Sequence, residues 1–117
     1  MLSPETLAVL KDNMPLAIAQ KQLSSAHLQH IYAQRWFSLW VPTDLGGLSA
    51  SLPEGCRLLE ELAYEDGGVA WCITLCSGAN MFAGFVDPEV AQQIFADPAV
   101  CWGGSGRPGG RAVREGE

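Results

Sequence analysis

Residues 69–85 read VAWCITLCSGANMFAGF, and this stretch decides the fold because it contains no charged side chain. Its apolar residues would occupy every side of a helix, among them Val69, Trp71, Ile73 and Phe82. A helix that is apolar all round is either buried in a larger body or lines a ligand. The pattern therefore predicts that Val69–Phe85 forms the most buried helix of the protein, and it gives the first indication of a ligand site.

Helix-start signals lie on both sides of this segment. Ser3 and Pro4 suit the cap and first turn of a helix, which Pro15 is expected to interrupt or kink because proline donates no N–H. Ser51 and Glu54 have the spacing of a capping box. Besides 69–85, we predict helices over residues 3–23 (with the break near residue 15), 26–34, 51–65 and 87–96. The predicted fold class is all-α, a bundle-like domain of five to six helices with an irregular or β-stub tail.

Composition and charge exclude several classes of protein. The chain has 117 residues, of which 48% are hydrophobic and 17% charged, so we expect one globular domain. A net charge of −6 disfavours binding to nucleic acid, which needs clustered Lys and Arg. No uninterrupted apolar run has the length of a membrane span, and the N-terminus lacks the pattern of a signal peptide. We therefore predict a cytoplasmic protein with no membrane span.

Cysteine and histidine give no sign of a metal site or a disulfide framework. The cysteines are expected to be small buried hydrophobes, since none lies in a CxxC pair and the chain has no export signal. His27 and His30 are expected to lie on the surface of an amphipathic helix without a catalytic role. We also predict that certain apolar helical residues point inward, namely Ile18, Leu23, Cys56, Leu58, Leu59 and Leu62.

The last part of the chain, residues 99–117, differs in character from the rest. Ala99–Trp102 has a strand-like composition, and residues 104–109 then read GSGRPG. This GxGxxG pattern binds a dinucleotide only when a helix follows it directly, and none is predicted here. A flexible glycine-rich connector is the simpler interpretation. The carboxylates of residues 60–66 are interpreted as a solvated helix face, and no residue set predicts a catalytic role.

Several motifs, in this order, resemble the acyl-CoA dehydrogenase superfamily. Residues 40–47, WVPTDLGG, are similar to that family's "vPeeyGG" loop, and residues 60–66, EELAYED, to its "eeLa..d" helix end. The uncharged helix and the VDPEVAQQI segment follow in the family's order and spacing. The resemblance implies an N-terminal helical domain over residues 1–98 and the start of a truncated β middle domain over residues 99–117.

The resemblance also implies an activity. It predicts the N-terminal part of an FAD-dependent oxidoreductase acting on the CH–CH bond of an acyl-CoA or another small hydrophobic substrate. Such a protein is expected to be a homo-oligomer, and this part alone is expected to be inactive. Residues 106–112 lack the Thr, Glu and Ser-Asp of the family's "TEpgaGSD" stretch. This leaves open a flavin-dependent monooxygenase of the same superfamily, which uses FMN or reduced flavin. A separate alternative is a free-standing helical interaction module that binds a partner through an exposed apolar face.

Positions that match the family's motifs give two groups of expected site residues. The resemblance assigns the substrate pocket to Ala70, Trp71, Thr74 and Gly78, and their spacing independently predicts one helical face. For Trp71, a plain core role is the alternative. The resemblance assigns flavin contacts to Trp102, Gly103, Gly104 and Ser105. It places the catalytic base outside these residues, so no catalytic residue is predicted.

Overall fold

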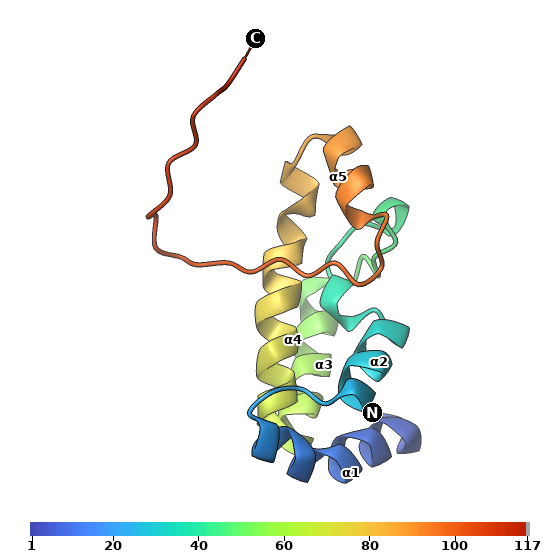
Figure 1. The fold of residues 1–117 in the computed structure, drawn as a ribbon. Helices are drawn as coiled ribbons and strands as arrows, with labels where there is room; N and C mark the ends of the chain where they lie inside the picture. The colour runs from blue at the N-terminus through green and yellow to red at the C-terminus, as the bar shows by residue number, and fades with distance from the viewer. Residues whose placement is uncertain (117) are drawn as a thin grey trace.

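The computed structural model describes residues 1–116, and all of its regular structure is helical (Figure 1). The all-α prediction is therefore confirmed. The α-helices are α1 (Pro4–Gln20), α2 (Ser25–Ala33), α3 (Leu52–Glu65), α4 (Gly67–Asn80) and α5 (Pro88–Phe95). Short 3₁₀ helices cover Trp36–Ser38, Thr43–Leu45 and Met81–Phe85.

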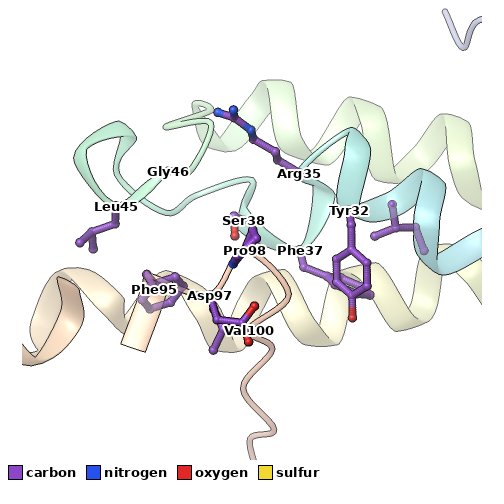
Figure 2. A pocket seen from close by; sticks show the side chains of 11 residues that line it. Tyr32, Arg35, Phe37, Ser38, Leu45, Gly46, Phe95, Asp97, Pro98 and Val100 are labelled. Atoms are coloured by element: carbon purple, nitrogen blue, oxygen red, sulfur yellow. The ribbon is translucent and has the colours of Figure 1, made fainter. Parts of the chain in front are cut away.

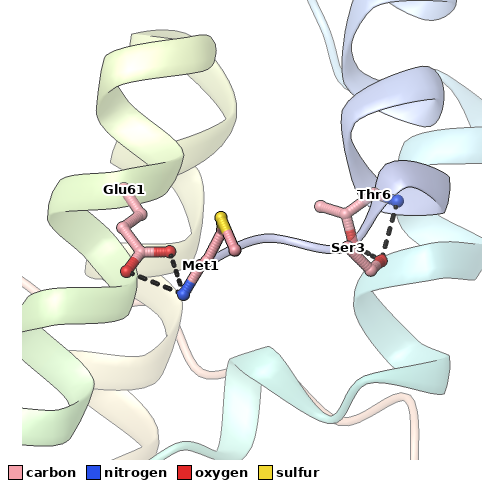
Figure 3. A network of polar contacts seen from close by, with 4 residues as sticks. All are labelled: Met1, Ser3, Thr6 and Glu61. Atoms are coloured by element: carbon pink, nitrogen blue, oxygen red, sulfur yellow. Dashed lines mark hydrogen bonds and ion pairs between the residues drawn. The ribbon is translucent and has the colours of Figure 1, made fainter.

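Figure 1 shows α3 and α4 side by side, with α1 across their lower end and α5 at the opposite end. The N-terminus is held to α3, since the Met1 amino group lies 3.0 Å from a Glu61 carboxylate oxygen (Figure 3). In the same view, Ser3 caps α1 by accepting the N–H of Thr6 at 3.1 Å. The position of α1 on the α3–α4 pair is set mainly by Leu10, which packs in the same buried core as Leu62 and Ile73.

The junction between α3 and α4 contains a single residue, Asp66. Its N–H donates to the carbonyl of Leu62 at 2.8 Å and so ends α3. Its carboxylate accepts the N–H groups of Gly68 and Val69 at 2.9 and 3.0 Å and so begins α4. The uncharged helix thus starts two residues before the predicted Val69, because Asp66 acts as a strong N-cap.

Helix α4 buries one stripe and leaves the opposite side open. It supplies more buried residues than any other helix: Val69, Ala70, Ile73, Ser77 and Asn80. This agrees with the prediction that it is the most buried helix, but the burial is one-sided, because no layer of the described chain covers its other side. That side exposes Trp71 (64%), Leu75 (54%), Phe82 (56%) and Phe85 (81%).

The stretch Gly67–Phe85 is also long and apolar enough to cross a membrane, with a mean hydropathy of 1.3. This observation depends only on length and composition, and the core helix of a soluble protein can have the same length and composition.

The main core forms where α1, α2, α3 and α4 meet around the 3₁₀ helix at Trp36–Ser38. Its buried residues include Leu10, Ile31, Leu62 and Ile73. A second, smaller core of Val41, Ala83 and Phe95 lies near α5 and the beginning of the tail. Val100 and Trp102 pack against this second core, which therefore holds the first residues of the tail against the helical body.

Helix α1 runs continuously through Pro15, so the predicted interruption is wrong. Pro15 lies on an exposed part of the helix, where the carbonyl that loses its partner can bind water. Ile18 was expected to point inward but is 70% exposed, because it lies on the solvent side of the same helix.

The turn at Gly46–Gly47 brings its backbone close to the backbone of Val41 and Pro42. Gly46 has a φ of 84°, a conformation that favours glycine. A Cβ on Gly47 would collide with the backbone of Val41, and the Gly47 N–H donates to the carbonyl of Pro42 at 3.0 Å. Local geometry therefore favours glycine at position 46 and leaves no space for a side chain at position 47.

The described part of the tail, residues 99–116, is irregular and contains no strand. Ala99–Trp102 does not form the β stub suggested by its composition, because no second strand lies beside it within residues 1–116. The tail crosses α4 and then leaves the helical body (Figure 1). The glycine-rich segment thus lies against the open side of α4 before it departs.

Candidate ligand groove between α4 and the tail

A groove of about 550 Å³ lies between the open side of α4 and the glycine-rich part of the tail. This volume is within the range typical of small-molecule sites, about 300–1,000 Å³. The helical side contributes Thr74, Leu75, Gly78, Ala79 and Phe82, and the tail contributes Trp102, Gly103, Gly104, Ser105 and Gly106.

Asn80 holds the two walls together. It is fully buried, and its amide nitrogen donates to the carbonyls of Phe37 at 3.0 Å and Val100 at 3.3 Å. Its amide oxygen accepts the N–H of Trp102 at 2.8 Å. A buried amide with both N–H groups and its oxygen paired is well satisfied. One side chain therefore fixes the start of the tail on the end of α4.

Apolar contacts reinforce this attachment. The indole of Trp102 packs on Phe95 with ring centroids 5.4 Å apart, and Val100 packs against the same small core. Further along, a Cβ on Gly104 would lie 3.6 Å from the Ala79 side chain. The glycine segment of the tail thus lies close to the helix, with room for one methyl group between Gly104 and Ala79.

The groove is mainly apolar, with a few polar groups on the tail side. In the part of the chain that the structure describes, the N–H groups of Gly103, Gly104 and Ser105 donate to no protein acceptor. The Thr74 hydroxyl donates to the carbonyl of Ala70 at 2.8 Å. No titratable side chain is among the residues that line the groove, so these residues can bind and orient a ligand but transfer no proton.

The structure brings six of the eight predicted site residues into this one groove. They are Thr74, Gly78, Trp102, Gly103, Gly104 and Ser105. Ala70 lies elsewhere, because it is 3% exposed and packs in the main core. Successive helical residues are turned by about 100°, so Ala70 falls at the edge of the buried stripe.

Trp71 lines a different groove, of about 590 Å³, between α4 and the C-terminal ends of α1 and α3. Its 64% exposure excludes the alternative that it is a core residue. The expectation that Trp71 and Thr74 share one pocket is not met, since α4 presents them to separate grooves.

Sequence reasoning missed four groove residues and the residue that anchors the tail. Phe82 follows Gly78 by four positions, so helical spacing could have identified it, and Leu75 is adjacent to Thr74. Ala79 and Gly106 carry no distinguishing signal. Asn80 is an amide at the end of an uncharged helix, and a buried polar residue there requires a hydrogen-bond partner.

A third hollow lies between α2, the turn at residues 43–46 and the start of the tail (Figure 2). Figure 2 shows Phe95, Asp97 and Val100 on one side of it and Leu45 and Arg35 on the other. Its volume is about 170 Å³, which is small for a substrate or cofactor site. The larger groove beside Trp71 contains only one of the predicted site residues, whereas the groove between α4 and the tail joins both predicted groups, so the latter is the candidate site.

The histidines are structural and buried, contrary to the expectation of a surface position. His27 is 1% exposed, and its Nδ1 accepts the N–H of Ser24 in the cap of α2. His30 is 8% exposed, and its Nε2 lies 2.9 Å from the Thr6 hydroxyl. Both expectations failed because capping and contact between α1 and α2 draw the rings inward. Within residues 1–116, no group of three or more His, Cys, Asp or Glu side chains could hold a metal ion.

The cysteines are also not the buried residues that were predicted. Cys56 and Cys101 are exposed, and Cys72 and Cys76 are half-buried. Cys56 lies on the outer side of α3, while the small residue that packs inward there is Gly55, against the ring of Trp40.

Comparison of the chain with protein-family models, with characterised proteins and with solved structures finds no match. A function for this chain therefore has to be inferred from the groove and from the sequence motifs.

Proposed function

We propose that this chain is the N-terminal part of a flavin-dependent oxidoreductase of the acyl-CoA dehydrogenase type. One observation supports the proposal most strongly. The resemblance assigns Thr74 and Gly78 to the substrate and Trp102–Ser105 to the flavin, and these two segments line the same groove. They come from separate parts of the chain, so their meeting does not follow from either motif alone.

The groove residues fit the ring end of a flavin. Leu75, Phe82 and Trp102 offer apolar surface to a flat ring, and the free N–H groups of Gly103–Ser105 can donate to polar atoms at its edge. The groove has no Lys or Arg lining for phosphates. The fit therefore covers the ring and an acyl chain but not the pyrophosphate of FAD.

When bound, FAD would accept a hydride from a carbon of the thioester substrate. The residues of this chain would bind and orient. The apolar side chains of Leu75 and Phe82 would give an acyl chain a surface to pack on, and Gly78 leaves room for it, since nothing lies within 4 Å of a Cβ built there. Because the groove residues transfer no proton, the base must come from outside them. This agrees with the proposal that the chain alone is inactive.

The second candidate is a flavin-dependent monooxygenase that uses FMN or reduced flavin. The observation in its favour is the composition of residues 106–112, which carry none of the polar residues that the dehydrogenase pattern places there. The groove itself suits either chemistry, because both need a flat ring held beside an apolar substrate.

The exposed side of α4 supports a further part of the proposal, self-association. Trp71, Leu75, Phe82 and Phe85 are each more than half exposed. Soluble monomers seldom leave large apolar patches bare. We propose that a second copy of the chain covers this side in a cytoplasmic homo-oligomer. A free-standing interaction module would use the same surface for a different protein.

The test uses lumiflavin, which is the flavin ring without phosphates. Titration of the isotope-labelled chain, followed by backbone NMR, should shift the amides of Thr74, Gly78 and Trp102–Ser105. Gly78→Leu should abolish these shifts by filling the groove. Gly84→Leu is the matched control, because a Cβ there also meets nothing within 4 Å and Gly84 does not line the groove.

Absence of any shift at millimolar lumiflavin, or equal shifts in both variants, would refute the flavin assignment. Repeating the titration with oxidised and chemically reduced lumiflavin separates the candidates. Tighter binding of the reduced ring favours the monooxygenase, and tighter binding of the oxidised ring favours the dehydrogenase.

A further inference from the structure

Two thiols meet where the tail crosses α4. Cys76 lies one helical turn before Asn80, and residues four apart on a helix are neighbours on its surface. The carbonyl of Val100 and the N–H of Trp102, on either side of Cys101, are both hydrogen-bonded to the Asn80 side chain at 3.3 and 2.8 Å. Because a helical side chain leans toward the turn before it, these two bonds hold Cys101 beside Cys76.

The two cysteines differ in their access to solvent. Cys101 is exposed, and Cys76 is half-buried. Burial, followed by the neighbouring Cys101 thiol, raises the pKa of Cys76 to about 12. Cys72, one turn further back, also has a raised pKa, mainly through burial. Reagents in solution therefore reach Cys101 first, and Cys76 is the thiol already in place to react with it.

We propose that Cys76 and Cys101 are a redox-active pair whose disulfide fastens the tail to α4. The oxidant is a small-molecule disulfide. The Cys101 thiolate attacks one of its sulfur atoms, forms a mixed disulfide and releases one small thiol. The Cys76 thiol then gives its proton to a base in solution as its sulfur attacks Sγ of Cys101, and the second small thiol leaves. The protein loses two protons and two electrons, and the small disulfide is reduced to two thiols.

The disulfide would act on the groove through the tail. Cys101 directly precedes the wall residues Trp102–Gly106, which noncovalent contacts hold in the reduced chain. A disulfide at Cys101 would prevent residues 102–106 from moving away from α4. The pair thus provides a way for the redox state to control how freely the groove opens, whichever ligand the groove binds.

The experiment treats the reduced chain with oxidised glutathione at mildly alkaline pH. Four free thiols should fall to two, and the intact mass should fall by about 2 Da through loss of two hydrogens. Cleavage after Glu65 and Glu89 separates Cys76 from Cys101, so the disulfide should join peptides 66–89 and 90–115 until reductant is added. The melting temperature should rise by about 10 °C.

Four variants identify the bond. Cys101→Ser and Cys76→Ser should abolish the joined peptide, while Cys72→Ser and Cys56→Ser should retain it. Cys101 is exposed, so its variant should fold normally. A disulfide confined to peptide 66–89, glutathione adducts without a protein disulfide, or four thiols that remain free would each overturn the proposal. None of these readouts involves a flavin, so the proposed function and this inference are tested separately.

Discussion

Asn80→Ala should release the tail from α4 while leaving the helical body folded. The substitution removes the partner of three groups, the carbonyls of Phe37 and Val100 and the N–H of Trp102. A typical hydrogen bond contributes about 0.5–1.5 kcal/mol net, and a buried group left unpaired costs about 1–3 kcal/mol. The Phe37 bond is buried, whereas the other two are partly accessible to water. We therefore expect the free energy of unfolding to fall by about 2–4 kcal/mol.

Two measurements test this expectation. Urea unfolding followed by far-UV circular dichroism gives the loss of stability. Hydrogen exchange of the Trp102 amide reports the tail alone, and its protection should disappear in the variant because its acceptor is gone.

Ser77→Ala is the matched control. Ser77 is equally buried on the same side of α4, but its hydroxyl donates only to carbonyls within the helix, at 2.6 Å for Ile73. The control should leave exchange at Trp102 unchanged. If Asn80→Ala costs less than about 0.5 kcal/mol, or if the Trp102 amide stays protected, Asn80 does not hold the tail as argued.

Three further substitutions and a pH series test other parts of the structure by urea unfolding. Trp71→Ala should cost less than about 1 kcal/mol, against about 3–5 kcal/mol for a buried tryptophan, because the side chain is 64% exposed; a loss above about 2 kcal/mol would contradict its placement. Gly78→Ala should stabilise the chain by about 0.5–1 kcal/mol, because the added methyl group meets nothing within 4 Å, and destabilisation would show that the groove is narrower than described. Gly47→Ala should destabilise it by about 1–3 kcal/mol, because its Cβ would collide with the Val41 backbone, and a neutral effect would rule out that close approach. Because the pKa of Cys76 rises from 9.0 to about 12 on folding, the unfolded chain releases this proton first, and stability should fall between about pH 9 and 12; the part of that fall due to Cys76 should be missing in Cys76→Ala.

The predictions that held depended on local chemistry. Ser51 and Glu54 form the expected capping box, and Asp87 with Pro88 begins α5, because caps involve residues only two or three positions apart. The spacing of Thr74 and Gly78 placed both on the groove side of α4 for the same reason.

The predictions that failed depended on contacts between distant segments. His30 is buried because α1 brings Thr6 to it, and no feature of α2 alone indicates that contact. The open side of α4 could not be located from its composition, which is the same for a buried helix and for one that lines a ligand. The groove requires the bond from Asn80 to Trp102, which joins residues 22 positions apart.

The single-residue junction at Asp66 makes the chain intolerant of length changes at that point. A loop absorbs an inserted residue by bulging outward, but here one residue closes α3 with its backbone N–H and opens α4 with its carboxylate. One extra residue would turn α4 by about 100° relative to α3. The stripe that contains Ile73 would leave the core, and the groove side would turn toward α3. Relatives of this protein should therefore vary in length at the tail and at the turn before α2, while the distance in sequence between Leu62 and Ile73 stays constant.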